Sequence, residues 1–135
     1  YTFVLGNPFT FVEFKLGDEI SRTIIANYPG RSIHKIPGIK QVSYVDKSSP
    51  SDWFVNTYNP ASGVSTVVTE TPAGSEDMVW VDSSSFLIGK NNTLLLWSDG
   101  RWYEPALPVF KMDGTISRIA LSPDRTKIAI VFTAN

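Results

Sequence analysis

Cysteine is absent from this chain of 135 residues, and histidine occurs only once, at position 34. The lack of cysteine excludes disulfide frameworks, thiolate zinc sites and cysteine nucleophiles. A single histidine excludes a three-histidine metal site within one chain, and a Ser-His-Asp triad would have to use His34 as its base. We therefore expect neither a metal ion nor a cofactor.

Charge of one sign and long apolar runs are also scarce. Twelve basic and thirteen acidic residues give a formal net charge of −1, and no like-charged run is present that would follow a phosphate backbone or an anionic bilayer. No apolar stretch approaches the length of a membrane span, which is about 20 residues. We therefore expect no nucleic-acid partner and no insertion into a membrane.

Turn residues are frequent, and short apolar runs lie between them. Nine prolines and nine glycines are spread along the chain. In residues 116–132, two β-branched runs flank Ser122-Pro123-Asp124-Arg125, where Pro123 presets φ and Asp124 can accept hydrogen bonds from nearby backbone. The run at 116–121 alternates as a strand with one buried face does, whereas the denser run at 128–132 predicts a strand buried on both faces.

The same pattern predicts thirteen strands and no helix. No segment longer than about ten residues has helical periodicity, so an all-β fold is expected. The eleven strands expected before the last two runs cover residues 1–5, 9–15, 20–26, 32–36, 40–45, 53–58, 64–70, 76–81, 85–88, 93–97 and 101–104.

An internal repeat indicates how these strands are grouped. Leu5, Val45, Ile88 and Val131 take equivalent places at separations of about 40–43 residues, a period typical of four-stranded β-propeller blades. The predicted architecture is a single propeller segment of about three four-stranded antiparallel blades forming an incomplete ring. Its parts are three strands in 1–30, a blade in 31–74, a blade in 75–113 and a partial blade in 114–135. Missing N-terminal blades or a second chain would then be needed to close the ring.

Several motifs suggest a family. Ser122-Pro123-Asp124 before Lys127 resembles the SPDG-type motif of TolB-like, WD40-like propeller repeats, with Arg125 where that family usually has glycine. Such a turn tolerates a residue other than glycine if its φ stays negative. Residues 53–72 look like the hairpin between the third and fourth strands of a blade in that family. Residues 30–38 are similar to a stretch of secreted TolB-like proteins of Bacteroidetes type.

The resemblance implies the C-terminal half of a six-bladed ring, located in the periplasm or secreted and bound to protein partners. In the topology of that family, the loop from one blade to the next lies at one mouth of the ring. Residues 31–34, 75–77 and 115–118 would then be neighbours. The candidate ligand-binding residues among them are Arg31, His34, Glu76, Asp77 and Arg118.

These residues favour two different functions. The leading hypothesis is a non-catalytic binding or scaffold module, in which the mouth meets a protein or a small polar ligand. The alternative is a hydrolase, or the propeller domain of a serine peptidase of the prolyl-oligopeptidase type. Catalysis requires His34 and the carboxylates within hydrogen-bond reach of one another. Glu76 and Asp77 are adjacent, so in a strand they would point to opposite faces and would not form an acid/base pair alone.

Overall fold

The computed structural model describes residues 2–5, 11–14, 17, 21–25, 32–105 and 113–134. These residues form strands, turns and loops, and no helix occurs among them. The prediction of an all-β fold is therefore confirmed. Thirteen strands lie in the described part of the chain, most of them within a few residues of the expected positions.

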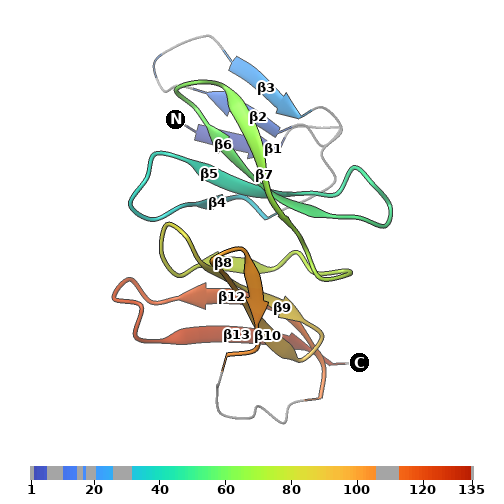
Figure 1. Ribbon diagram of the computed structural model, residues 1–135. Coiled ribbons are helices and arrows are strands. Elements are labelled where there is room, and N and C mark those ends of the chain that lie inside the picture. The colour runs from blue at the N-terminus through green and yellow to red at the C-terminus, as the bar shows by residue number, and fades with distance from the viewer. Residues whose placement is uncertain are drawn as a thin grey trace.

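The strands form four antiparallel sheets, each made from strands that are consecutive in the chain (Figure 1). The first sheet contains β1 (Thr2–Leu5), β2 (Phe11–Phe14) and β3 (Ser21–Ile25). The second contains β4 (His34–Lys35), β5 (Val42–Asp46), β6 (Phe54–Asn59) and β7 (Val64–Glu70). The third contains β8 (Met78–Trp80), β9 (Phe86–Lys90), β10 (Thr93–Ser98) and β11 (Arg101–Tyr103). The fourth contains β12 (Thr115–Leu121) and β13 (Ile128–Thr133).

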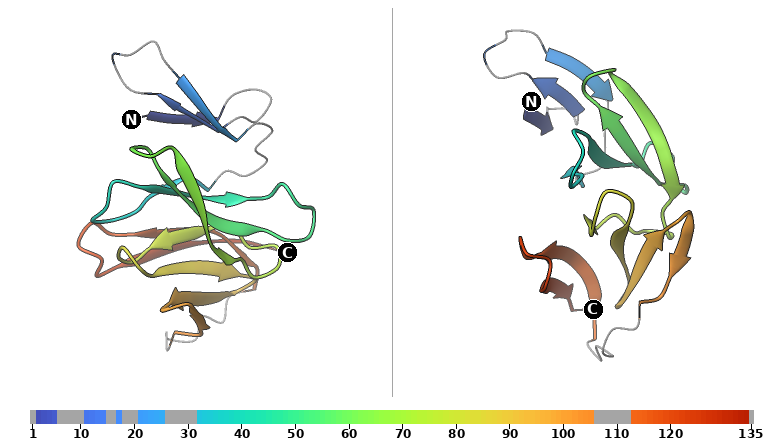
Figure 2. Two further views of the ribbon diagram at one scale, coloured as in Figure 1. Left: turned by 45° about the horizontal axis from the view of Figure 1, so that its top comes forward. Right: turned by 60° about the vertical axis from the view of Figure 1, so that its left-hand side comes forward.

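The second and third sheets have the expected blade-like form, with four antiparallel strands in the order of the chain. Figure 2 shows, in its right-hand view, that the four sheets follow one another along an open arc. The first strands of the last three sheets lie next to one another, because β8 contacts both β4 and β12. None of the sheets closes into a ring. The assignment of the whole chain to one propeller domain remains a prediction.

Apolar side chains fill the space between the second and third sheets. This core contains Ile36, Val45, Val55, Met78, Trp80, Phe86 and Ile88. A smaller cluster of Leu94, Ile116 and Ile119 joins the third sheet to the fourth. Neighbouring sheets thus pack face to face, as blades do, and each sheet buries apolar surface that it cannot bury alone.

One expectation about the fourth sheet is wrong. The strand at 128–132 is not buried on both faces: its side chains alternate between half-buried and exposed along β13. Ile130 packs on the cluster that contains Ile119, whereas Val131 is 54% exposed. The physical reason is that β13 pairs only with β12 and places only one of its faces against the third sheet.

Ile130→Asp tests this alternation. The substitution should lower the free energy of unfolding by about 2–3 kcal/mol, because it places a charge on the half-buried face. The matched control is Val131→Asp, which should cost less than about 1 kcal/mol because its side chain meets solvent. Urea unfolding of the two variants measures the difference. Equal losses would contradict the one-sided burial of β13.

The turn between β12 and β13 corrects a second expectation. The expected turn requires a negative φ at Arg125, but the observed φ is +58°. The backbone of Arg125 is therefore strained. The turn is held by local hydrogen bonds: Arg125 N donates to the Ser122 carbonyl at 2.8 Å, and Thr126 N donates to Asp124 Oδ1 at 3.1 Å. The hydroxyl of Ser122 also donates to Asp124, and this hydrogen bond is the main cause of the lowered pKa of Asp124.

Arg125→Gly should stabilise the protein. A left-handed backbone costs a residue with a Cβ roughly 1–2 kcal/mol, and part of the gain is offset by the greater freedom of glycine in the unfolded chain. The expected net gain is about 0.5–1 kcal/mol in the free energy of unfolding. Arg125→Ala is the control, since it removes the same side chain but keeps the strain. If both variants are equally stable, the strain at this position is not released by glycine.

Candidate functional site

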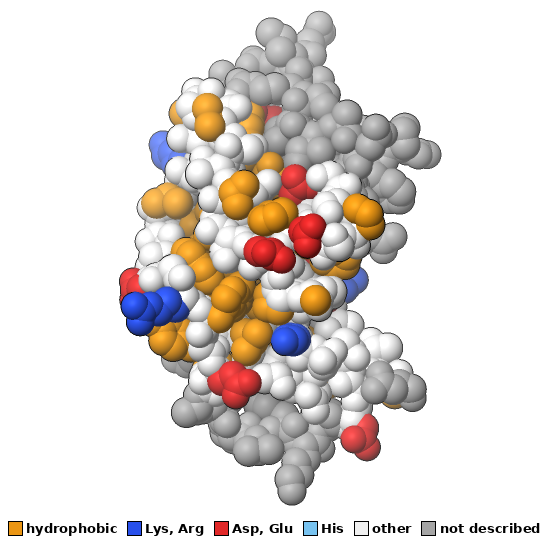
Figure 3. All heavy atoms as spheres, turned by 45° about the vertical axis from the view of Figure 1, so that its right-hand side comes forward, with side chains coloured by type: hydrophobic (Ala, Val, Ile, Leu, Met, Phe, Trp, Pro, Cys, Tyr) orange, Lys and Arg blue, Asp and Glu red, His pale blue; other side chains and the backbone are white. Residues whose placement is uncertain are grey.

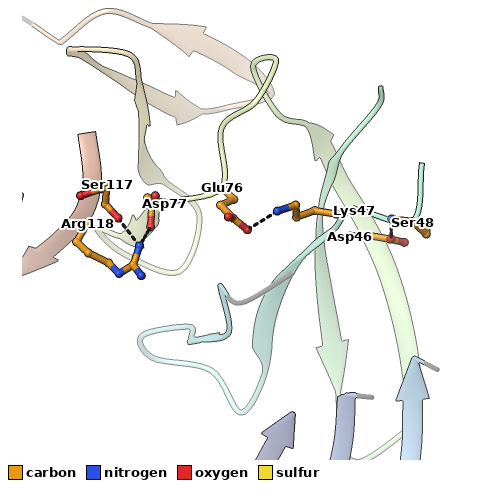
Figure 4. Close-up of polar contacts among 7 residues, drawn as sticks. All are labelled: Asp46, Lys47, Ser48, Glu76, Asp77, Ser117 and Arg118. Atoms are coloured by element: carbon orange, nitrogen blue, oxygen red, sulfur yellow. Dashed lines mark hydrogen bonds and ion pairs between the residues drawn. The ribbon is translucent and has the colours of Figure 1, made fainter. Parts of the chain in front are cut away.

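Four charged side chains join three sheets at one end of their strands (Figure 4). Lys47 directly follows β5, and its Nζ lies 3.2 Å from Glu76 Oε2. Asp77 Oδ1 lies 3.1 Å from Nη1 of Arg118, which belongs to β12. Glu76 and Asp77 lie in the loop before β8, so the two adjacent carboxylates reach opposite neighbours, the second sheet and the fourth. We call Lys47, Glu76, Asp77 and Arg118 the charged ladder.

Local structure holds the two cations of the charged ladder in place. The Lys47 ammonium lies 4.2 Å from the ring centroid of Trp53, within the range of a cation–π contact. The register of β12 against β13 shifts between Ile116 and Arg118, and the Arg118 guanidinium also donates a hydrogen bond to the Ser117 carbonyl. The register shift in the first half of β12 therefore lies next to Arg118, whose side chain reaches the third sheet.

The ion pair of Asp77 and Arg118 joins a partly buried carboxylate to an exposed guanidinium. Burial raises the pKa of Asp77, and the positive charge of Arg118 opposes that rise without cancelling it. Arg118 itself remains largely exposed, with 69% of its side chain accessible, and an exposed partner compensates desolvation weakly. Asp77 therefore binds its proton more tightly in the folded protein than in the unfolded chain. Its contribution to stability falls as the pH rises through this raised pKa.

The strand register places His34 on one face of the second sheet. It pairs with Ser43 in the register of β4 and β5, and Ser43 Oγ accepts a hydrogen bond of 2.7 Å from Trp80 Nε1 of the third sheet. Paired residues share a face of a sheet, so His34 belongs to the face that meets the third sheet. Burial lowers its pKa and favours the neutral imidazole. In the described part of the chain, no hydrogen bond or ion pair joins His34 to Glu76, Asp77 or Arg118.

The lowered pKa of His34 makes stability depend on pH. The folded protein resists protonation of this imidazole, so its contribution is present above the unfolded pKa of 6.5 and is lost as the pH falls toward the folded value. The free energy of unfolding of the wild type should therefore fall more steeply below about pH 6.5 than that of His34→Gln. Urea titrations at several pH values measure both slopes. Parallel curves would show that His34 is freely solvated.

The candidate residues expected from the sequence are thus distributed as follows. Glu76, Asp77 and Arg118 lie together in the charged ladder, while His34 lies on a face between sheets. Arg31 falls outside the described residues. Lys47 was not among the expected residues, because the expectation covered only the loops between blades and Lys47 lies in the loop after β5. The signal for it was topological: the loop after the second strand of a blade lies at the same end of the sheet as the loops between blades.

Other polar contacts also join neighbouring sheets. The Tyr58 hydroxyl donates a hydrogen bond to Glu13, a residue of β2 that is only 4% exposed. This bond joins the first sheet to the second, and the contact between Trp80 and Ser43 joins the second to the third. The pair of Asp77 and Arg118 joins the third sheet to the fourth, so each junction contains a polar cross-link. The described residues contain no group of three or more side chains of the types His, Cys, Asp and Glu that could hold a metal ion.

Comparisons with models of protein families, with curated proteins and with solved structures find no match to this chain. The described residues also include no helix with the length and hydropathy needed to cross a bilayer. The fold and the contacts therefore define a class only: an all-β protein of blade-like antiparallel sheets that are stacked in an arc and cross-linked by polar side chains.

Proposed function

We propose that this chain is a non-catalytic interaction module, a segment of a TolB-like β-propeller that binds protein partners or a small ligand. The observation that carries this proposal is the pairing of the candidate charges with one another. Glu76 and Asp77 are each engaged by a cation from a neighbouring sheet. These charges position the loops between sheets, and the described residues contain no acid and base that are directed at a common substrate.

The energetics of the charged ladder agree with a positioning role. Ion pairs of this exposure contribute about 0–1 kcal/mol each, so they add little to the free energy of unfolding. They do fix the loop before β8 against two other sheets at once, since its adjacent carboxylates reach in opposite directions (Figure 4). A loop fixed in this way presents a defined, preorganised surface, which is what a binding site requires.

The hydrolase alternative lacks the contact that it requires. A triad or an acid/base pair would need His34 within hydrogen-bond reach of a carboxylate. His34 instead lies on the face of the second sheet that meets the third. No described contact favours the propeller domain of a serine peptidase over a binding module.

The partner that we propose supplies further β-sheets. The arc of four sheets is open, so its end sheets lack neighbours on one face (Figure 2). Additional blades of the same polypeptide or a second chain would cover these faces, in the periplasm or outside the cell. On the face shown in Figure 3, hydrophobic side chains run across the middle, and acidic and basic ones lie among them without a broad patch of either sign. This distribution supports a protein partner over a nucleic acid.

An activity panel separates the two functions. Hydrolysis of fluorogenic esters, peptides, phosphomonoesters and glycosides is measured with the wild type, His34→Ala and Asp77→Asn. The expected rates for all three proteins equal those of buffer alone. A wild-type rate above buffer that is lost in His34→Ala would overturn the proposal and establish the hydrolase.

Light scattering at increasing protein concentration tests whether a second copy closes the ring. If two chains share one ring, the mean mass should approach that of a dimer. If the protein stays strictly monomeric at all concentrations, two copies of this chain do not share one ring. Further blades of the same polypeptide would then be the remaining source of the sheets that close it.

A further inference from the structure

A second region lies at the opposite end of the strands from the charged ladder. The turn between β4 and β5 and the turn between β6 and β7 both project there, on the left in Figure 1. Between them is an open pocket of about 790 Å³, a volume within the range of small-ligand sites. No residue of the charged ladder lines this pocket, so its function is independent of that cluster.

The pocket combines an apolar floor with two cations. Ile33, Ile39, Val42 and Pro60 supply apolar surface, and Lys35 and Lys40 supply ammonium groups. Ile39 is 38% exposed, which leaves an isoleucine partly in contact with water at the pocket. Apolar surface with a few convergent polar groups is the usual composition of a ligand site.

The strand register explains why these side chains gather. Lys35 pairs with Val42 across β4 and β5, so the two side chains share one face of the sheet. Ile33 lies two residues before Lys35 and therefore belongs to the same face. The tight turn at Gly38, with φ of +76°, returns the chain so that Lys40 stands near Lys35. The backbone bond from Ile36 N to the Gln41 carbonyl, 3.1 Å long, closes this turn.

The described residues that line this pocket include two lysines and no acidic side chain. Both lysines are exposed, and neither forms an ion pair with any described residue, in contrast to Lys47, which pairs with Glu76. Two like charges on one short hairpin repel each other, and a bound anion relieves that repulsion. A carboxylate can accept hydrogen bonds from both ammonium groups, and such charge-assisted bonds are the stronger kind.

From these observations we propose that the pocket binds a small amphipathic carboxylate, with its acid group between Lys35 and Lys40 and its apolar chain on Ile33, Ile39 and Val42. The inference goes beyond the proposed interaction function, because it names a second site and the chemical class of its ligand. If the activity panel shows no hydrolysis, the proposal of a carboxylate site still stands. If octanoate does not bind, the proposed interaction function still stands, because it rests on the contacts between sheets.

The test is an NMR titration of the labelled protein with octanoate, with acetate and octan-1-ol as probes of the acid group and the chain alone. Octanoate should give saturable shifts that centre on the amides of residues 33–36, 38–42 and 61. Acetate and octan-1-ol should each bind at least about tenfold more weakly, since each lacks one part of the ligand.

Variants identify the two cations. Lys35→Met with Lys40→Met should weaken octanoate binding by at least about tenfold, and Lys35→Arg with Lys40→Arg should retain it. The matched control is Lys90→Met with Lys127→Met, which removes the same charge from exposed positions outside the pocket and should leave binding unchanged. The proposal is overturned if octanoate gives no saturable shifts, if the shifts centre elsewhere, if octan-1-ol binds equally well, or if the methionine pair at 35 and 40 binds as the wild type does.

Discussion

Replacing Phe86 with alanine should lower the free energy of unfolding by about 3–5 kcal/mol. Phe86 is fully buried between the second and third sheets. Its ring lies 5.0 Å from that of Trp80, 5.4 Å from that of Trp97 and 5.7 Å from that of Trp102, measured between centroids. Alanine would remove all three aromatic contacts and leave a cavity that these large rings fill poorly.

Urea unfolding monitored by tryptophan fluorescence measures this loss, because three of the four tryptophans contact Phe86. The control is Tyr103→Ala, at an aromatic residue that is 44% exposed and should cost less than about 1.5 kcal/mol. If the two variants lose the same stability, the aromatic cluster is not the centre of the core.

Replacing Gly89 with alanine should cost about 1–3 kcal/mol, the usual effect of overpacking. A Cβ at this position in β9 would lie 2.6 Å from Ile116 Cγ2 and 2.9 Å from Ile116 Cβ. Ile116 is a buried residue of the fourth sheet, and its backbone N donates to the Asn91 carbonyl at 2.6 Å. The backbone of the third sheet therefore approaches the fourth too closely for any side chain at Gly89. A thermal unfolding midpoint equal to that of the wild type would contradict this close approach.

The strands were predictable because their signals are local. Runs of β-branched residues between turns placed all thirteen near their observed positions. The errors arose at strand ends: the strand expected at 32–36 is only His34–Lys35, and the one expected at 76–81 begins at Met78. The second difference affects the charged ladder, because it leaves Glu76 and Asp77 in a loop, where adjacent carboxylates can reach different sheets.

The contacts between sheets were not predictable in the same way. Alternation along a strand says which residues share a face, but it does not say which sheet covers that face. For this reason β13 was expected to be covered on both sides, and the third sheet was not predicted as the neighbour of the face that carries His34. Lys47 was missed because it lies in the loop after β5 and the expectation covered only the loops between blades. The positive φ of Arg125 depends on a turn closed by side-chain hydrogen bonds.

A double-mutant cycle between Gly89 and Ile116 is the most direct measurement of the central claim, which is that neighbouring blade-like sheets pack face to face in an arc. Free energies of unfolding are compared for the wild type, Gly89→Ala, Ile116→Ala and the double variant. Ile116→Ala removes the closest contact of the new methyl group, the one to Cγ2 at 2.6 Å, although the contact to Cβ at 2.9 Å remains. The double variant should therefore be more stable than the sum of the single losses allows, by about 1 kcal/mol. Losses that add to within about 0.5 kcal/mol would show that the two residues do not meet, and the stacked arrangement would then be wrong.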